Sequence, residues 1–321
     1  MKQKLLIGVD IGGTTIKMAF INMNGQIREQ WYIPTDTSEK GKQISNDIAN
    51  SIRDHSLQLN IPYDTFAGIG MGAPGFINMK TGFIYNAVNL GWENYPLKDD
   101  LELKSGLPVY IDNDANIAAL GEMWKGSGNR SDDLICVTLG TGVGGGIISN
   151  GMILHGANGM AGEIGHMTAV PQGGAPCNCG KTGCVETIAS ATGIVRIATE
   201  GLSKYPESLL NQTYDINRSL TSKDVFECAS KEDQWAVDVV QFVSLHLGLT
   251  IANLANALNP SKIVIGGGVS KAGERLLEPL QEVFNQFALP RVRDKAELVI
   301  ASLGNDAGII GAAWLVKENI S

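Results

Sequence analysis

Three of the five cysteines in this sequence crowd into one short segment. Cys177, Cys179 and Cys184 fall within eight residues of one another, and His166 lies eleven residues upstream of the first. Soft thiolates and an imidazole on a glycine-bent loop are ligands that suit tetrahedral zinc. A chance cluster of buried thiols is the alternative, but the spacing favours metal binding. Four protein ligands leave no open position, so we expect a structural zinc that orders the loop.

Two glycine-rich segments suggest a second kind of chemistry. The first is Asp10-Ile11-Gly12-Gly13-Thr14, and the second runs from Leu139 to Gly146. A turn without side chains exposes backbone N–H groups to a polyphosphate. Tight turns would explain either segment alone, whereas two matching segments favour a nucleotide held between two lobes. Asp10 is placed to hold Mg²⁺ directly or through water, and Thr14 and Thr141 offer hydroxyls to the phosphates.

Two better-known nucleotide motifs do not fit these segments. Gly140 to Gly145 matches the dinucleotide fingerprint, but a hairpin at Asn150-Gly151 follows it where a helix would be needed. Lys181-Thr182 after Gly180 imitates the end of a Walker A loop, yet Gly174 lies one residue too far upstream. A dehydrogenase and a P-loop ATPase are therefore disfavoured.

Asp114 lies where a predicted strand gives way to a predicted helix. Leu107 to Asp112 alternates like a strand, and Ala115 to Trp124 has helical periodicity. A carboxylate at such a junction is a candidate general base. Asp also commonly caps a helix at this position, and Asn113 would equally serve a turn. The residue types alone leave both interpretations open.

The elements that must position these residues repeat one plan. A meander of three strands is predicted at Leu5 to Asp10, Thr15 to Asn22 and Gln26 to Ile33, and a second one begins at Leu134. Each glycine-rich segment is the corner between the first two strands of its meander. Helices are predicted from Ile44 and at Ala236 to Leu258, Arg275 to Phe287 and Ala307 to Val316, and further strands at Phe66 to Met71, Lys262 to Ile265 and Glu297 to Ser302. Residues 201–232 have mixed periodicity and support no assignment.

Length and composition describe an ordinary globular protein. At 321 residues, 44% of them hydrophobic and 18% charged, the chain favours two domains around a cleft over a single core. A net charge of −8 disfavours a nucleic-acid partner. The apolar stretch Ala236 to Leu258 carries several polar residues and indicates a buried helix, so we expect no membrane partner. The first residues show no signal-peptide pattern, which predicts a cytoplasmic protein. The two cysteines outside the cluster, Cys136 and Cys228, are expected to be inert core thiols.

These motifs together resemble the ROK family of sugar kinases and repressors, and within it the bacterial glucokinases. The resemblance runs over nearly the whole chain, and the cysteine segment is its most specific part. The matching segments are Asp10 to Thr14 with Lys17, Gly72-Ala73-Pro74-Gly75, Asn89-Leu90-Gly91-Trp92, Asn113 to Asn116, Thr138 to Gly146, Ala161 to His166, the cysteine segment ending at Glu186, and Gly266-Gly267-Gly268-Val269.

The resemblance implies an α/β fold of two ribonuclease-H-like lobes, of the actin and hexokinase type, around a central cleft. We expect residues 1–114 with 305–321 to form a small lobe, and residues 115–304 to form a large lobe that carries a zinc-stabilised loop at 166–186. The implied cofactors are ATP, Mg²⁺ and a structural Zn²⁺, and a homodimer is the usual assembly.

The resemblance also implies a reaction and a set of site residues. The reaction is ATP-dependent transfer of the γ-phosphate to the 6-hydroxyl of a hexose, with glucose the leading candidate and Asp114 the general base. The implied sugar-binding residues are Gly72, Asn89, Asn113, Asp114, Glu163, His166 and Glu186. The implied ATP-binding and phosphate-binding residues are Asp10, Gly12, Gly13, Thr14, Lys17, Gly140, Thr141, Gly142, Gly144, Gly266, Gly267 and Gly268. His166 would place one ring nitrogen on zinc and turn the other to the sugar.

Three alternatives stay open at this point. A kinase for another sugar, such as N-acetylmannosamine, N-acetylglucosamine, fructose or allose, fits the same motifs. A sugar-responsive repressor is disfavoured, because we expect no helix-turn-helix domain ahead of the first strand and the chain is acidic. A binding protein without turnover is disfavoured by the two glycine-rich corners together with Asp114. The sequence leaves open the preferred hexose, the choice between ATP and polyphosphate as donor, the oligomeric state and regulation.

Overall fold

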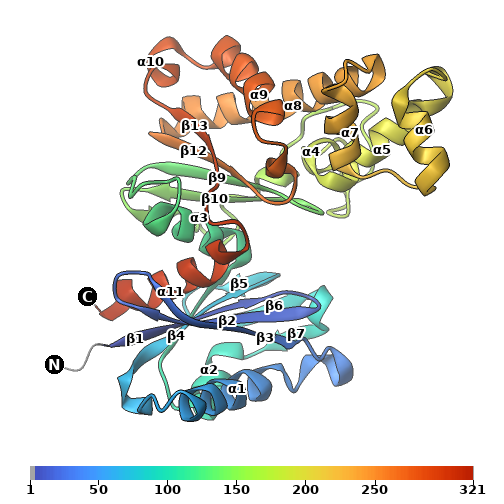
Figure 1. Cartoon of the computed structure of the whole chain (residues 1–321). Helices are drawn as coiled ribbons and strands as arrows, with labels where there is room; N and C mark the ends of the chain where they lie inside the picture. Colours follow the sequence, from blue (N-terminus) through green and yellow to red (C-terminus); the bar gives the residue numbers. More distant parts are fainter. Residues whose placement is uncertain (1–3, 321) are drawn as a thin grey trace.

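The protein folds into two lobes, each built on a five-stranded sheet (Figure 1). The computed structural model describes residues 4–320. The first sheet, in the order β3-β2-β1-β4-β8, comprises β1 (Leu5–Ile11), β2 (Thr15–Asn22), β3 (Ile27–Pro34), β4 (Phe66–Ala73) and β8 (Val109–Asn113). The second, in the order β11-β10-β9-β12-β13, comprises β9 (Leu134–Leu139), β10 (Val143–Ser149), β11 (Met152–Ile153), β12 (Lys262–Gly266) and β13 (Glu297–Ile300).

The two sheets share one topology. In each, three consecutive strands pair antiparallel as a meander, a fourth strand adds in parallel to the first of them, and a fifth adds in parallel to the fourth. This is the ribonuclease-H-like arrangement expected of an actin or hexokinase type of protein, so the prediction that the chain uses one plan twice is confirmed. Parallel additions need long crossovers, which explains why the helices are inserted between the later strands.

Helices cover both faces of the first sheet, so β1 and β2 are buried along almost their whole length. α1 (Ile44–Gln58) and α2 (Leu97–Ser105) lie on one face, and α11 (Ala307–Ile320) lies on the other (Figure 1). A Cβ on Gly8 would lie only 2.1 Å from the carbonyl oxygen of Ile309, and one on Gly70 only 1.7 Å from that of Ala312. Glycine at these two strand positions therefore lets α11 dock on the sheet.

α3 (Asp114–Lys125) and α11 pack against each other between the two lobes (Figure 1). A Cβ on Gly121 of α3 would lie 2.1 Å from the carbonyl oxygen of Ala307, and one on Gly311 of α11 would lie 1.7 Å from that of Ile117. Such close approach is possible only because neither position carries a side chain. α3 also contacts β9 and β10, while α11 contacts β1 and β4, so this helix pair joins the lobes.

Glu122 of α3 fixes the chain on the large-lobe side of this junction. Its side chain is buried, and its two carboxylate oxygens accept hydrogen bonds from the backbone N–H groups of Ser127, Ser302 and Leu303, at 2.9, 3.2 and 2.8 Å. A buried carboxylate with three backbone donors is well satisfied. The bonds hold the segment between β13 and α11 against α3.

The large lobe adds a layer of helices to the second sheet. They are α4 (Glu186–Ala189), α5 (Ala191–Gly201), α6 (Leu209–Asn217), α7 (Ser222–Ala229), α8 (Gln234–Leu258), α9 (Glu274–Phe287) and α10 (Pro290–Arg293). Within the part of the chain that the structure describes, α8 alone is long and apolar enough to cross a membrane, yet 56% of that stretch is buried inside the lobe. α8 is therefore a core helix, as the sequence indicates.

The sequence alone left several elements unassigned, among them α2, α5, α10 and those of two further regions. β5 (Phe76–Asn78), β6 (Phe83–Ala87) and β7 (Trp92–Tyr95) form a small antiparallel sheet in the first lobe. These strands have at most five residues and several exposed positions, so they lack a readable alternation. Residues 201–232 contain α6 and α7, and the capping box of Thr221 and Asp224 marks the start of α7.

Candidate active site

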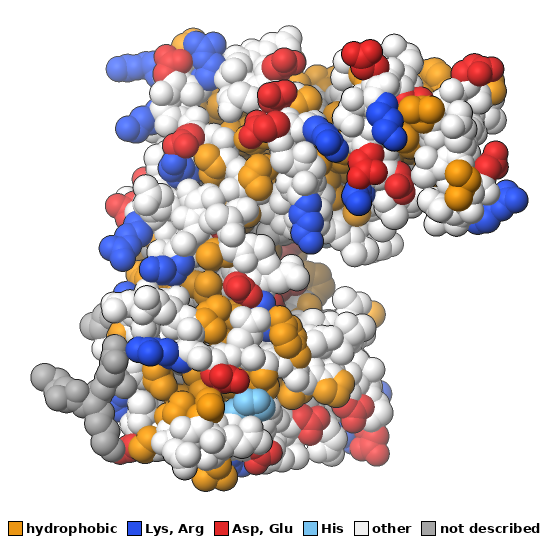
Figure 2. All heavy atoms as spheres, in the orientation of Figure 1, with side chains coloured by type: hydrophobic (Ala, Val, Ile, Leu, Met, Phe, Trp, Pro, Cys, Tyr) orange, Lys and Arg blue, Asp and Glu red, His pale blue; other side chains and the backbone are white. Residues whose placement is uncertain are grey.

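A cleft of about 770 Å³ separates the two lobes, and the space-filling view shows the molecule hollowed between them (Figure 2). Both lobes contribute to its walls. The predicted site residues that line it are Asp10, Gly12, Asn89, Asp114, Gly140, Gly142, Gly144, Glu186, Gly266, Gly267 and Gly268. Gly13, Thr14 and Thr141 belong to the same two glycine-rich turns, and the remaining predicted residues are placed below.

The three glycine-rich segments lie at the ends of strands that face the cleft. The turn between β1 and β2 is closed by a hydrogen bond from the Gly12 N–H to the Thr15 carbonyl oxygen at 3.0 Å. The turn between β9 and β10 is closed by one from the Gly140 N–H to the Gly142 carbonyl oxygen at 2.9 Å. Gly267, after β12, has a φ of +83°, and a Cβ there would lie 2.4 Å from the carbonyl oxygen of Leu139. The third segment therefore packs on the second, and together they offer backbone without side chains to a polyphosphate.

Asp114 is the first residue of α3, directly after β8 delivers it to the cleft. Asn113 is the residue that caps the helix, since its Oδ1 accepts the Ala115 N–H at 2.8 Å, and the Asp114 Oδ1 accepts the same N–H at 2.8 Å. Solvent still reaches Asp114 through the open cleft, but the protein around its carboxylate desolvates it and raises its pKa. A raised pKa makes a carboxylate a stronger proton acceptor, as a general base requires.

Asp10 faces the first turn of α11. A Cβ on Gly308 would lie 2.3 Å from the Asp10 Oδ2, so glycine at position 308 makes room for the carboxylate. Burial, followed by repulsion from Asp114, raises the pKa of Asp10 to about 6, against the opposing effect of Lys17. A divalent cation bound here would favour the ionised carboxylate. The surroundings of Asp10 thus fit a Mg²⁺ ligand.

Removing the charge of Asp10 is expected to stabilise the ligand-free protein. The folded-state pKa of about 6 lies above the ordinary value of 3.8, so ionisation of Asp10 above pH 6 disfavours the folded state, and protonation removes this cost as the pH falls towards 4. Asp10→Asn should therefore raise the free energy of unfolding at pH 8 by at most about 3 kcal/mol, and the gain should vanish near pH 4.

Urea unfolding of the wild type and of Asp10→Asn across this pH range measures the effect. Asp99→Asn on the exposed side of α2 serves as the control. Equal stability of Asp10→Asn and the wild type at pH 8 would contradict the argument.

Lys17 and Gly72 lie behind the cleft lining. The Lys17 ammonium is buried, donates to the carbonyl oxygen of Asn305 at 2.8 Å and pairs with Asp306, so it holds the turn that precedes α11. Gly72 of β4 is buried, and a Cβ there would lie 1.9 Å from Cδ1 of Ile117. Glycine at position 72 thus lets α3 pack on β4. Contact between Gly72 and a sugar stays a prediction.

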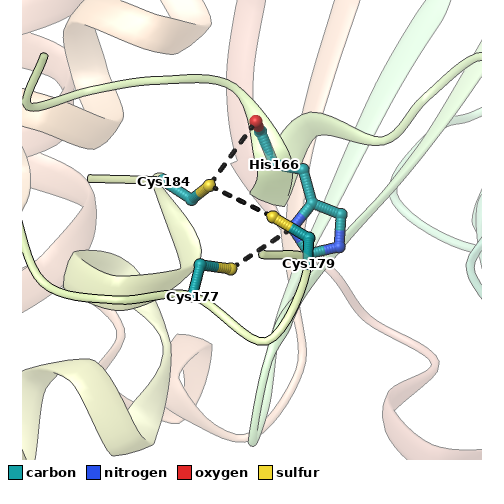
Figure 3. Close-up of side chains that lie close together, drawn as sticks. All are labelled: His166, Cys177, Cys179 and Cys184. Carbon is teal, nitrogen blue, oxygen red and sulfur yellow. Dashed lines mark hydrogen bonds between the residues drawn. The ribbon is translucent and has the colours of Figure 1, made fainter. Parts of the chain in front are cut away.

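The predicted zinc ligands meet on one loop of the large lobe (Figure 3). The ligand atoms of His166, Cys177, Cys179 and Cys184 all lie within 4.8 Å of one another. Cys179 Sγ lies 3.6 Å from Cys184 Sγ, and Cys177 Sγ lies 3.6 Å from His166 Nδ1. These separations fit the edge of roughly 3.7 Å expected between ligands about 2.3 Å from a tetrahedral centre. Burial and the neighbouring thiols raise the pKa of Cys184 to about 12, an effect that a bound Zn²⁺ would reverse because it binds thiolate.

Two carboxylates connect this loop to the cleft. Nε2 of His166 faces away from the thiols and lies 3.9 Å from Oε2 of Glu163, so the two ring nitrogens point to different partners. Glu186 accepts the Val143 N–H of the second glycine-rich corner at 3.0 Å, and its other oxygen lies 3.8 Å from Cys177 Sγ. Burial raises the pKa of Glu163, with Asp114 and Glu186 adding to the effect and His166 opposing it. The loop therefore positions an acidic cluster beside Asp114.

Several residues that line the cleft were missed by the sequence analysis. They are Thr138 and Glu122, together with Ser270, Lys271, Asn305 and Gly308. Thr138 is the first residue of a segment that the sequence did single out, although it was not named as a site residue, and Ser270 follows another such segment. Asn305 and Gly308 come from the turn before α11 and its first residues, where no motif marks them; only the docking of α11 between the lobes brings them to the site.

Two ribonuclease-H-like lobes around a cleft lined with glycine and carboxylates define the actin and hexokinase class of proteins. The chain belongs to the ROK family, whose profile matches residues 6–319.

Individual relatives agree with this assignment. The chain is 59% identical over 318 residues to a glucokinase of Halalkalibacterium halodurans, covering 99% of this chain and 96% of the relative. It is 30% identical to a xylose repressor of Caldicellulosiruptor bescii, covering 98% of this chain and 78% of the repressor. A crystal structure of a ROK glucokinase from Streptomyces griseus with glucose and AMPPNP matches with a TM-score of 0.79 and 36% identity, over 98% of this chain and 99% of that one.

Proposed function

We propose that this protein is an ATP-dependent glucokinase that transfers the γ-phosphate of ATP to the 6-hydroxyl of glucose. The identity of 59% to a glucokinase along essentially the whole chain carries this conclusion. The cleft supports this function, because it is lined by two kinds of group that the reaction needs. Three glycine segments are suited to a polyphosphate, and a group of carboxylates is suited to a polyol.

Asp114 acts as the general base. It accepts the proton of the 6-hydroxyl while the oxygen attacks the γ-phosphorus; the bond from that phosphorus to the β–γ bridging oxygen breaks, and ADP leaves. Its raised pKa favours this proton transfer. Mg²⁺ supplies charge neutralisation on the phosphates when bound, and Asp10 would hold it directly or through water. Most of the acceleration comes from positioning the hydroxyl in line with the phosphate.

The sugar is held by groups that pair with its hydroxyls. Asn89, Asn113, Glu163, His166 and Glu186 supply amides, carboxylates and an imidazole, and each unpaired partner would penalise a sugar of the wrong shape. His166 offers Nδ1 to the zinc and Nε2 to the sugar, an assignment supported by the position of Glu163 beside Nε2. Zinc supplies order to the loop that carries these residues.

ATP lies along the glycine segments of both lobes. Gly12, Gly13 and Thr14 of the first corner and Gly140, Thr141, Gly142 and Gly144 of the second contact the phosphates, with Lys17 close to the first corner. Gly266 to Gly268 line the adenosine side. The lobes, at residues 1–114 with 305–321 and at 115–304, close on the two substrates about the pair α3 and α11.

ADP release from Mg²⁺ and ATP with a panel of hexoses and N-acetylhexosamines tests the function. Turnover with glucose well above the other sugars is expected. Turnover confined to an amino sugar or another hexose would keep the mechanism and replace the substrate. ATP and glucose bound without ADP release would instead favour a regulator such as the related xylose repressor.

The protein is proposed to work in the cytoplasm as a homodimer, without a nucleic-acid or membrane partner. Support for the dimer comes from α8, where Phe242, Leu245 and Leu249 are 40, 42 and 36% exposed. Their spacing of three and four residues places them on one face of the helix. Exposed apolar side chains gathered in this way are typical of a protein interface.

A charge on this face is expected to separate the subunits. Leu245→Glu should shift the wild-type dimer to a monomer in analytical ultracentrifugation, because an unpaired carboxylate would be buried in the contact. Leu103→Glu on α2, a position that is 85% exposed, is the control. A Leu245→Glu variant with the sedimentation of the wild type would place the subunit contact elsewhere.

A further inference from the structure

Asp112 is a buried carboxylate two residues upstream of the proposed base, Asp114. It occupies the penultimate position of β8, and its side chain is 3% exposed. Oδ1 accepts the Asn113 N–H at 2.8 Å and the Asn116 amide at 2.7 Å, and Oδ2 lies 2.7 Å from Nε2 of His155. Both oxygens are therefore engaged, as a buried charge requires.

His155 reaches Asp112 from the other lobe. It follows β11 of the second sheet, whereas β8 is an edge strand of the first sheet. The hydrogen bond with Asp112 raises the pKa of His155, against the lowering effect of burial, and Glu318 of α11 is the other charged group that faces the pair. The contact thus ties the large lobe to the end of β8 with a charge-assisted hydrogen bond.

Two hydrogen bonds of Asp112 are made with residues that flank the proposed base. Asp112 holds the backbone of Asn113 and the side chain of Asn116, on either side of Asp114. The second glycine-rich corner, which would hold the phosphates, belongs to the same large-lobe meander as the β11 strand that precedes His155. His155 is therefore a second link, besides the packing of α3 on β9 and β10, between the part that holds the donor and the segment that carries the base.

We propose that His155 is a positioning residue for phosphoryl transfer, acting through Asp112 to hold Asp114 in register with the phosphates of ATP. The proposal rests on the proposed kinase function. Its physical basis is that a base, an attacking hydroxyl and a phosphorus atom must align closely, and a displacement of about 1 Å costs on the order of 100-fold in rate. Loss of the His155 side chain would remove the hydrogen bond that ties the end of β8 to the large lobe, and would remove no contact with either substrate.

Two substitutions of His155 separate positioning from general stability. His155→Gln keeps an N–H donor near the place of Nε2, whereas His155→Leu removes it with little change in volume. We expect His155→Leu to lower kcat by about 10- to 100-fold, with the KM for glucose and the calorimetric Kd of glucose changed by less than about threefold. His155→Gln should restore most of kcat. Asp112→Asn combined with His155→Leu should be no worse than the poorer single variant, because both break one link.

The controls define what would overturn the proposal. His55→Leu, at a half-buried histidine of α1 that stacks on Trp31 and is not among the residues lining the cleft, should leave kcat unchanged. Wild-type kcat in His155→Leu, or equal losses in the Leu and Gln variants, would exclude a positioning hydrogen bond. If His155→Leu fails to fold, His155→Asn replaces it, since its shorter amide cannot reach Asp112. A wild type that turns over no sugar would overturn the kinase function and this proposal together.

Discussion

Asp114→Asn is expected to lower kcat for glucose phosphorylation by at least about 100-fold while glucose still binds. The amide keeps the size of the carboxylate and can still accept the Ala115 N–H, so α3 keeps its start. It cannot take up the proton of the 6-hydroxyl, and it no longer repels Asp10, whose pKa should fall. Coupled measurement of ADP release, together with calorimetric titration of glucose, checks both parts of this prediction.

The control for Asp114→Asn is a variant that removes one aspartate charge outside the cleft. Asp99→Asn, in the exposed first turn of α2, alters net charge by the same amount and should leave kcat within about twofold. If Asp114→Asn also retained the turnover of the wild type, Asp114 would be only a residue of the helix start, and another carboxylate of the cluster would have to act as the base.

Cys184→Ser is expected to abolish zinc binding and to unfold the loop that carries His166. Cys184 is fully buried, and its Sγ lies 3.6 Å from that of Cys179. A hydroxyl does not replace a thiolate on Zn²⁺, so bound zinc should fall from one equivalent per chain to nearly none. We expect a melting temperature lower by about 5 °C or more. The affinity for glucose should fall about 10- to 100-fold, because the histidine loses its orienting ligand.

Cys228→Ser is the matched control, since Cys228 is also buried in the large lobe but lies outside the cluster. It should lose a little stability and keep one equivalent of zinc and the affinity of the wild type for glucose. The zinc content of both variants is measured by mass spectrometry, and their melting temperatures are measured by thermal unfolding. A stable Cys184→Ser protein that still holds one zinc would remove Cys184 from the ligand set.

Both the fold class and the family were readable from the sequence, and the structure and comparisons confirm them. The two meanders were visible because the alternation of apolar residues and the Asn-Gly turns are local signals. The clustering of zinc ligands was visible for the same reason, since three of the four lie within eight residues. The small β5-β6-β7 sheet and α6 were not predicted, because short, partly exposed elements carry no such pattern.

Local units could be read from the order of residues alone: two meanders with glycine-rich corners, the Asn113-Asp114 junction and the thiolate loop. Their mutual placement was decided by contacts between residues far apart in the chain. α11 brings Gly308 to Asp10 only because Gly8, Gly70 and Gly311 allow it to dock. His155 meets Asp112 across the lobes, 43 positions away. Long-range packing of this kind depends on shape and close approach, which no local periodicity encodes.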